Sequence, residues 1–278
     1  MKLKKEISQN IVNPTTLKSG HTYVITAPVS VSSKLTIECD VTIYIRNDSV
    51  TGNGLNFLQS SELIAEEVDF FACDDKNEKI NEAQNGGLVF NGTIGPSNFV
   101  TGYSYNADAS NFVAKKIRCN YLGGFGNTTL TSGASSISIN NINSDEWNIL
   151  SVSTNYSGGD GVEFNEAQVD FEFLSVQFPS VNGLCVNNST LTIDKGLKIK
   201  TGDSNNLIEM VPNQNQDNNQ LCYIKLPTHT KVYLDGIWDE NIQIVSKALP
   251  QPASNEVDTP YYFRECTSCG QTYIFPTN

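Results

Sequence analysis

Basic residues are scarce in this sequence. Its 278 residues include 18 lysines and arginines against 30 aspartates and glutamates, a net charge of −12. The only basic run is the short MKLKK at the N-terminus. Binding along a nucleic-acid backbone requires a positively charged surface that releases counterions. The composition therefore argues against a nucleic-acid partner, and an acidic surface rich in Asn and Ser suits a soluble protein.

Long apolar runs are missing too. A transmembrane helix needs about 20 consecutive apolar residues, and the sequence contains no such run. The N-terminal MKLKKEISQNIVNP has basic residues but no apolar segment after them, as a secretory signal would require. We expect no membrane span, and either a signal peptide that has been removed or another route out of the cell.

Histidine and arginine are too rare for several familiar active sites. The two histidines, His21 and His229, lie far apart with no motif around them, so Ser–His–Asp chemistry has no support. The three arginines, Arg46, Arg118 and Arg264, do not stand beside acidic pairs in repeated positions, as a polysaccharide lyase would favour.

The seven cysteines are scattered, most of them in apolar runs such as LTIECDV and GLCVNN. Buried free thiols behave as small apolar side chains, and we expect free thiols rather than disulfides. Only Cys266 and Cys269 form a CxxC pair, and the two further ligands of a zinc site do not follow. The sequence predicts no metal and no cofactor, and whether Cys266 and Cys269 form a disulfide stays open.

What the sequence does contain is a repeat of about 22 residues made of short strands. Alternating runs rich in Val, Ile, Phe and Thr are separated by Gly, Asn, Asp and Ser. Equivalent apolar positions recur in the middle of the chain. The proposed columns are Trp147, Val169 and Leu191; Ile149, Phe171 and Ile193; Leu150, Leu174 and Leu197; Val152, Val176 and Ile199; Ile137, Val162 and Leu184; and Ile139, Phe164 and Val186.

A unit of this size cannot bury its apolar face alone, but stacked units can. The sequence therefore predicts an all-β fold, a right-handed parallel β-helix (solenoid) with capping segments, of roughly ten coils that rise about 4.8 Å each. A β-sandwich is the alternative. We expect an N-terminal cap or arm over residues 1–20 and the β-helix over 21–245. The expected loop excursions lie near 74–86, 97–112 and 211–220, and a Pro-rich linker and β-prone tail span 246–278.

Four stretches resemble a family of bacterial surface and secreted right-handed parallel β-helix proteins, common in Bacteroidota. They are HTYVITAPVSVSSKLTIECDVTIYI (21–45), GGLVFNGTIG (86–95), IRCNYLGGFG (117–126) and LSVSTNYSGGDGVEF (150–164). The sequence departs from that family at Cys39 and Asp40, where a Pro-Gly turn is usual, and at Gly159-Asp160, where paired aspartates are usual. The resemblance implies the fold and an extracellular location, and it implies no catalytic residues.

Four carboxylates are weak candidates for catalysis: Asp170, Glu172, Glu163 and Asp160. Asp170 and Glu172 lie two apart on one strand, so they share a face at about the separation that glycoside hydrolysis needs. Asp160 lies in NYSGGDG, and Phe125 takes its place in the earlier NYLGGFG. Such a corner does not need a carboxylate, so a turn is the favoured interpretation.

Aromatic residues in TGYSYNADASNF make Tyr103, Tyr105 and Phe112 candidates for a ligand-binding loop, although a loop folded back on the core is the favoured interpretation. The acidic pair Asp74 and Asp75 opens a polar stretch that we interpret as a solvated loop rather than a calcium site.

The function that these observations favour is non-enzymatic. We expect a structural or attachment protein displayed outside the cell, on a cell surface or in a virion such as a phage tail or capsid appendage. Its expected partners are other structural subunits or surface glycans, with a homo-oligomer through the C-terminal tail as a further option. The alternatives are a bacterial adhesin and a polysaccharide lyase or glycoside hydrolase.

Overall fold

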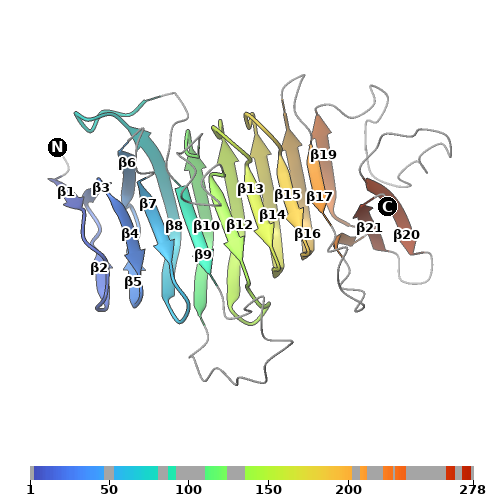
Figure 1. Cartoon of the computed structure of the whole chain (residues 1–278), viewed down its shortest axis with the longest axis horizontal. Coiled ribbons are helices and arrows are strands. Elements are labelled where there is room, and N and C mark those ends of the chain that lie inside the picture. The colour runs from blue at the N-terminus through green and yellow to red at the C-terminus, as the bar shows by residue number, and fades with distance from the viewer. Residues whose placement is uncertain are drawn as a thin grey trace.

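The computed structural model describes residues 3–46, 53–80, 87–91, 110–123, 135–201, 207–211, 222–227, 229–235, 261–266 and 271–276. Within these ranges the chain is all-β, and no helix is present. The same ranges accordingly hold no helix long and apolar enough to cross a membrane. The strands form one 14-stranded and one 7-stranded sheet, and almost all neighbours in both sheets run parallel (Figure 1).

The 7-stranded sheet is made of short strands that pair in chain order. We call it the third face. Its strands are β4 (Pro28–Val31), β7 (Gly54–Phe57), β9 (Gly87–Asn91), β11 (Ile137–Asn140), β13 (Val162–Asn165), β15 (Leu184–Asn187) and β17 (Ile208–Val211).

The 14-stranded sheet contains long strands, each of which bends across a corner. These are β8 (Glu62–Cys73), β10 (Asn111–Asn120), β12 (Trp147–Asn155), β14 (Gln168–Gln177) and β16 (Thr190–Lys200). In β14, for example, Phe171 and Leu174 are both buried with two residues between them. On a straight strand, side chains that share a face recur every second residue. The spacing of three between Phe171 and Leu174 therefore marks a bend in β14. Each long strand therefore contributes to two faces.

Shorter strands extend these two faces at the ends of the stack. β2 (Thr15–Leu17), β5 (Lys34–Ile37) and β18 (Tyr223–Pro227) align with the N-terminal halves of the long strands and complete the first face. β1 (Leu3–Ile7), β3 (His21–Ile25), β6 (Thr42–Arg46) and β19 (Lys231–Asp235) align with the C-terminal halves and complete the second face.

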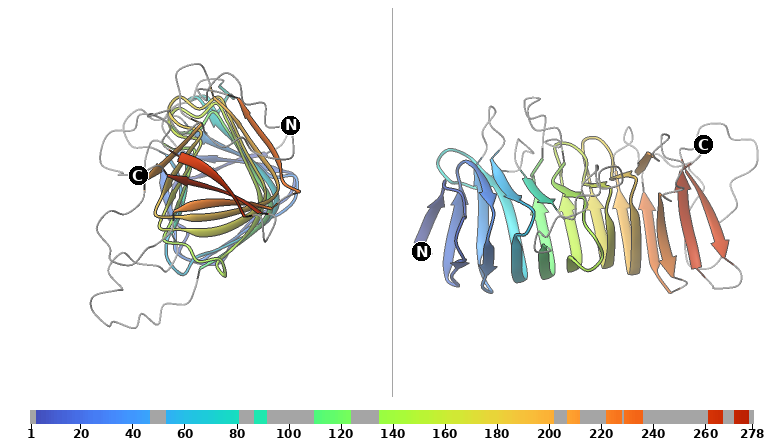
Figure 2. Two further views of the ribbon diagram at one scale, coloured as in Figure 1. Left: turned by 90° about the vertical axis from the view of Figure 1, so that its right-hand side faces the viewer. Right: turned by 60° about the horizontal axis from the view of Figure 1, so that its bottom comes forward.

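The chain visits the three faces in a fixed order and then begins the next layer. Between residues 135 and 201 this path is described without a break, from β11 through β16. The view along the rod shows successive layers superposed on one roughly triangular outline (Figure 2). The fold is therefore solenoid-like, with parallel pairing between layers in place of hairpins within them.

Most of the predicted columns are confirmed by the strand pairing. Ile137 pairs with Val162 and Val162 with Leu184, and the neighbouring column through Phe164 follows the same register. Phe171 pairs with Ile193, and Ile149, on the preceding strand, is buried as they are.

Two predicted columns are wrong at their first member, which is displaced by two residues along β12. Leu150 is 44% exposed, and Val152, not Leu150, pairs with Leu174, which in turn pairs with Leu197. The error arises at the corner, where Leu150 points outward although it fits the spacing of the leucines. Thr154 then takes the place that was predicted for Val152, opposite Val176.

The core lies between the three faces and forms one continuous cluster along the rod. Its centre holds a run of aromatic rings in edge-to-face and stacked contacts, from Phe57 and Phe90, stacked at 4.9 Å, through Phe112 and Trp147 to Phe171. Such pairs add stability beyond their buried area. The layers are thus held together by side chains as well as by main-chain hydrogen bonds.

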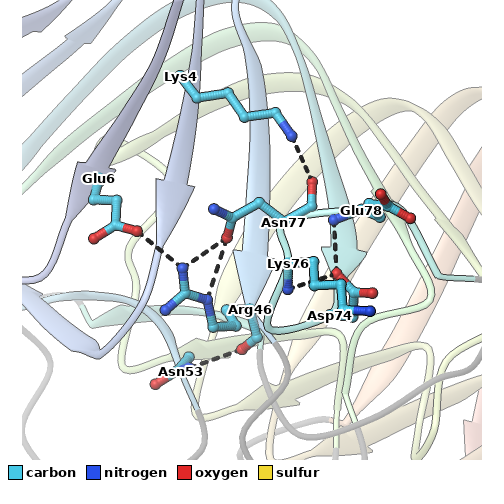
Figure 3. Close-up of polar contacts among 8 residues, drawn as sticks. All are labelled: Lys4, Glu6, Arg46, Asn53, Asp74, Lys76, Asn77 and Glu78. Atoms are coloured by element: carbon cyan, nitrogen blue, oxygen red, sulfur yellow. Dashed lines mark hydrogen bonds and ion pairs between the residues drawn. The ribbon is translucent and has the colours of Figure 1, made fainter.

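The N-terminal segment adds strands to the stack. Residues 3–17, which the sequence analysis assigns to a cap or arm, include β1 and β2, and Ile11 forms a parallel bridge with Val31 of the third face. The loop of residues 74–80 returns to this end, where Arg46 donates to Glu6 Oε1 (2.9 Å) and to Asn77 Oδ1 (2.7 Å) (Figure 3). Lys4 Nζ donates to the Asn77 carbonyl at 2.8 Å. These contacts tie the first described strand to the loop.

The C-terminal end is covered differently. The tail forms an antiparallel hairpin of β20 (Tyr261–Cys266) and β21 (Gln271–Pro276), and β21 pairs antiparallel with β18. The tail thus folds back on the last strand of the first face. Pairing with another subunit stays a prediction.

The free-thiol interpretation holds for the cysteines that are described. Cys73, Cys119, Cys185 and Cys222 are buried and unbridged. Cys39 is also free, but it is exposed, because it lies beside Asp40 in the turn that follows β5. Cys269 lies outside the described residues, as does the side chain of Cys266.

Candidate functional site

The structure brings Asp160 and Glu163 together with a third carboxylate, Glu209, on the outside of the third face. Glu163, Cys185 and Glu209 occupy one outward column, because Glu163 pairs with Cys185 and Cys185 with Glu209. With neighbouring strands about 4.8 Å apart, the Cα atoms of the two glutamates are roughly 10 Å apart. We call Asp160, Glu163, Glu209 and Cys185 the third-face acidic cluster.

Each carboxylate of the cluster already has hydrogen-bond donors. Asp160 Oδ1 accepts from the backbone N–H of Asn182 at 2.8 Å, and Glu209 Oε2 accepts from Asn182 Nδ2 at 2.7 Å. Glu163 Oε2 accepts from two serine hydroxyls, of Ser135 (3.2 Å) and Ser138 (3.1 Å). The carboxylates thereby join neighbouring layers of the stack.

Burial and mutual repulsion alter the proton affinity of this cluster. Burial raises the pKa of Asp160 and the Asn182 N–H opposes that shift, while the charges of Glu163 and Glu209 raise it further. Burial, with the negative charges of Asp160, Glu209 and Glu163, raises the pKa of the Cys185 thiol to about 12. Cys185 is therefore a thiol at neutral pH, and a nucleophilic thiolate is not available there. A carboxyl of raised pKa close to other carboxylates is a pattern that catalytic sites share with structural networks.

The other two catalytic candidates do not join this cluster. Asp170 and Glu172 both point outward from β14, on the first face and its corner. Glu172 Oε1 is ion-paired with Lys195 Nζ at 2.6 Å, and Asp170 is exposed. Glu172 is thus held by a lysine of the next strand, and nothing in the described residues draws Asp170 toward a second acid.

The predicted aromatic binding loop is wrong at one of its three residues. Phe112 is fully buried in β10 and contacts Phe57, Phe90 and Trp147, so its ring cannot meet a ligand. Phe112 lies near the start of β10 and not in the polar loop that precedes this strand. Tyr103 and Tyr105 lie outside the described residues.

The acidic stretch at Asp74 is a closed turn, as the solvated-loop interpretation expects. Asp74 Oδ1 accepts from the backbone N–H groups of Lys76 (3.0 Å) and Glu78 (2.7 Å), and Asn77 adopts a positive φ of 63° (Figure 3). Side chains of Asp commonly stabilise turns in this way. Among the residues that the structure describes, no cluster of three His, Cys, Asp or Glu side chains could hold a metal ion.

Two polar ladders run along the rod, and the sequence analysis did not predict either of them. On the third face, Asn56, Asn91, Asn140, Asn165 and Asn187 bond amide to amide, with Nδ2–Oδ1 distances between 2.8 Å and 3.3 Å. On the second face, Gln177 donates to Asn155 and Asn155 to Asn120, both at 3.0 Å.

An outer aromatic stack follows the second ladder. Tyr121, Tyr156 and Phe178 have positive φ values of 59°, 55° and 54° at the corner where the second face ends. Their rings stack at 4.8 Å and 5.0 Å, and Lys200 Nζ lies 5.3 Å from the centre of the Phe178 ring. The stacked rings therefore cover part of one another's faces.

Comparisons with known protein families, with curated proteins and with solved structures found no match. The resemblance to bacterial surface β-helix proteins therefore remains a prediction, and the function has to be argued from the geometry above.

Proposed function

We propose that this chain is a right-handed parallel β-helix that serves as a non-enzymatic structural or attachment protein outside the cell. In this proposal it belongs to a phage tail or capsid appendage, or to a bacterial surface, and contacts glycans or other structural subunits. The observation that carries it is the continuity of the outward columns. In two of these columns, the asparagine ladder of the third face and the outer aromatic stack, side chains of like chemistry recur from layer to layer, which suits an extended ligand or a neighbouring rod better than a single reacting bond.

The physical reason is the rigidity of the stack. Each layer is bonded to the next by main-chain pairing, by the amide ladders and by the aromatic core. Binding by a pre-formed surface avoids the cost of ordering it at the moment of contact. Such a rod can present the same face over several layers.

The experiment is a binding and turnover screen with the purified chain. We expect retention on at least one immobilised glycan, and no new reducing ends or unsaturated products from soluble glycans. Release of either product would contradict the non-enzymatic proposal. Mass spectrometry of purified phage particles and of the bacterial surface fraction distinguishes the two settings.

A glycoside hydrolase is the second candidate, because the third-face acidic cluster places a carboxyl of raised pKa beside two others. A protonated acid near a carboxylate is the arrangement that glycoside hydrolysis uses. If the screen finds turnover, Asp160→Asn and Glu163→Gln should abolish it. Asp170→Asn with Glu172→Gln serves as the control pair and should leave it unchanged.

A further inference from the structure

The second face carries an unusual charge for this protein. Across β10, β12, β14, β16 and β19 its outward residues fall into three register columns, which together we call the second-face strip. The columns are Lys116, Ser151, Phe173, Gly196 and Lys231; Arg118, Ser153, Ser175, Lys198 and Tyr233; and Asn120, Asn155, Gln177, Lys200 and Asp235.

Five of these positions are cationic and one is anionic, in a chain whose net charge is −12. Arg118 is ion-paired with Asp69 and Glu67 of β8, and Lys200 with Asp235. Within the described part of the chain, Lys116, Lys198 and Lys231 have no carboxylate partner. At the β10 end, Lys116 lies opposite Glu67 of β8 in the register, so the free positive charge of the strip lies at its β16 and β19 end, at Lys198 and Lys231.

The middle of the strip is mostly polar, and two of its serines have no side-chain partner in the described residues. Ser153 and Ser175 occupy adjacent positions, are partly exposed, and make no side-chain hydrogen bond within the described residues. Asn155 and Gln177, in the next column, hold their amides in place through the ladder. Hydroxyl and amide groups at the floor of such a strip can bond to the hydroxyls of a ligand.

Apolar side chains border the strip on both sides. Leu150 and Phe173 are 44% and 46% exposed on the side of the first face. Tyr156 and Phe178 of the outer aromatic stack, 44% and 37% exposed, border the opposite side. Exposed apolar groups that flank a polar centre are typical of a recognition surface.

We propose that the second-face strip binds an anionic, extended polysaccharide, a polyuronate or its sulfated equivalent, laid along the rod. The free lysines would pair with its acidic groups, the serines and amides would bond to its hydroxyls, and the apolar borders would pack against its C–H faces. From Lys116 to Lys231 the strip spans four strand spacings, roughly 19 Å. The proposal rests on the function proposed above and gives it a site and a class of ligand.

A nucleic acid fits this surface less well than an acidic glycan. Single strands are held by bases that stack on free aromatic faces. Here Tyr121 and Tyr156 stack on each other at an angle of 2°, Lys200 lies against Phe178, and Lys198 Nζ lies 5.8 Å from the centre of the Tyr233 ring. The exposed Phe173 by itself does not make a row of stacking faces. The strip offers hydroxyl and amide groups in its middle and positive charge at Lys198 and Lys231, which a glycan with acidic groups and many hydroxyls can use.

The test compares polygalacturonate with a neutral glucan of the same length, binding each to the full chain in solution. We expect the wild type to bind the polyuronate and not the glucan, with an affinity that falls as salt is raised. Lys198→Glu with Lys231→Glu should weaken binding at least tenfold. The matched control, Lys18→Glu with Lys34→Glu, makes the same charge change away from the strip and should stay within twofold.

The outcomes separate this proposal from the one on which it rests. Equal polyuronate binding by both double variants, or a preference for the neutral glucan, overturns the strip as the site and leaves glycan attachment standing. Binding to no member of a broad glycan panel overturns both. If Lys198→Glu with Lys231→Glu abolishes self-association of the chain instead, the strip is a subunit interface and the glycan proposal fails.

Discussion

On the third face, outward side chains bond to one another from layer to layer; on the second face, many of them do not. The asparagine ladder from Asn56 to Asn187 and the acidic cluster both use their polar atoms within the molecule. Ser153, Ser175 and Lys198 of the second face keep theirs toward solvent. One plan of strands and corners thus produces one face devoted to stability and another available for contact.

The largest effect should come from crowding the corner that leads into the third face. A Cβ added at Gly183 would lie 2.3 Å from the carbonyl oxygen of Leu207 and 2.4 Å from Ile199. Backbone cannot yield cheaply, so Gly183→Ala should cost about 3 kcal/mol. Thermal unfolding should show a Tm lower by roughly 6–10 °C.

The matched control lies on the second face. A Cβ at Gly196 would meet the ring of Phe173 at 3.0 Å, and that ring is 46% exposed and free to turn. Gly196→Ala should therefore change the Tm by less than 2 °C or so. Equal decreases in Tm in the two variants would contradict the predicted clash between layers at Gly183.

A smaller effect should distinguish the ladder from the open hydroxyls. Asn165 donates to Asn140 at 2.9 Å and accepts from Asn187 at 2.8 Å, so Asn165→Ala breaks two bonds of the ladder. At about 1 kcal/mol for each bond, the expected loss is about 2 kcal/mol in urea unfolding. Ser153→Ala removes a hydroxyl with no partner in the described residues and should cost less than about 0.5 kcal/mol. If the ladder contributes nothing to stability, the two variants will have the same urea midpoint of unfolding.

The sequence predicts the third face better than the second for a physical reason. Third-face strands are short and straight, so alternation and a fixed spacing place Ile137, Val162 and Leu184 correctly. The same register, moved by one residue, would have placed Glu163 beside Cys185. Glu209 follows Cys185 after a gap of a different length, so its place in this column is found only from the structure.

In the long strands, the spacing of apolar residues does not show where the chain bends at a corner. Leu150 fits the spacing of the leucines, but the chain bends there and turns its side chain outward. An added residue in β16, where Phe171 pairs with Ile193 but Phe173 with Gly196, shifts the register again. The second-face strip depends on that register, so its cations could not be brought together from spacing alone. Phe112 follows a run of polar residues, so the sequence predicts that it lies in a loop. Tertiary packing instead places its side chain in the core.

The smallest effect concerns the third-face acidic cluster and depends on pH. Burial raises the pKa of Asp160 in the folded chain, so the folded chain holds the proton of this carboxyl more tightly than the unfolded chain does. Below the unfolded pKa the carboxyl is protonated in both states and costs nothing. As pH rises through the folded pKa, the buried charge beside Glu163 and Glu209 lowers stability. Asp160→Asn removes that charge, and its amide oxygen can still accept from the Asn182 N–H.

At pH 7 the variant should therefore be more stable than the wild type, by about 1–3 °C in Tm. The difference should shrink toward zero as the pH is lowered below about 4, where the wild-type carboxyl is protonated in both states. Glu172→Gln is the control, because its charge lies in an exposed ion pair with Lys195, and such pairs contribute little. A destabilised Asp160→Asn at pH 7 would mean that the carboxylate charge itself holds the layers together. The charged hydrogen bond from the Asn182 N–H to Asp160 would then outweigh the cost of burying the charge beside Glu163 and Glu209, and the third face would depend on that charge as well as on its neutral amide ladder.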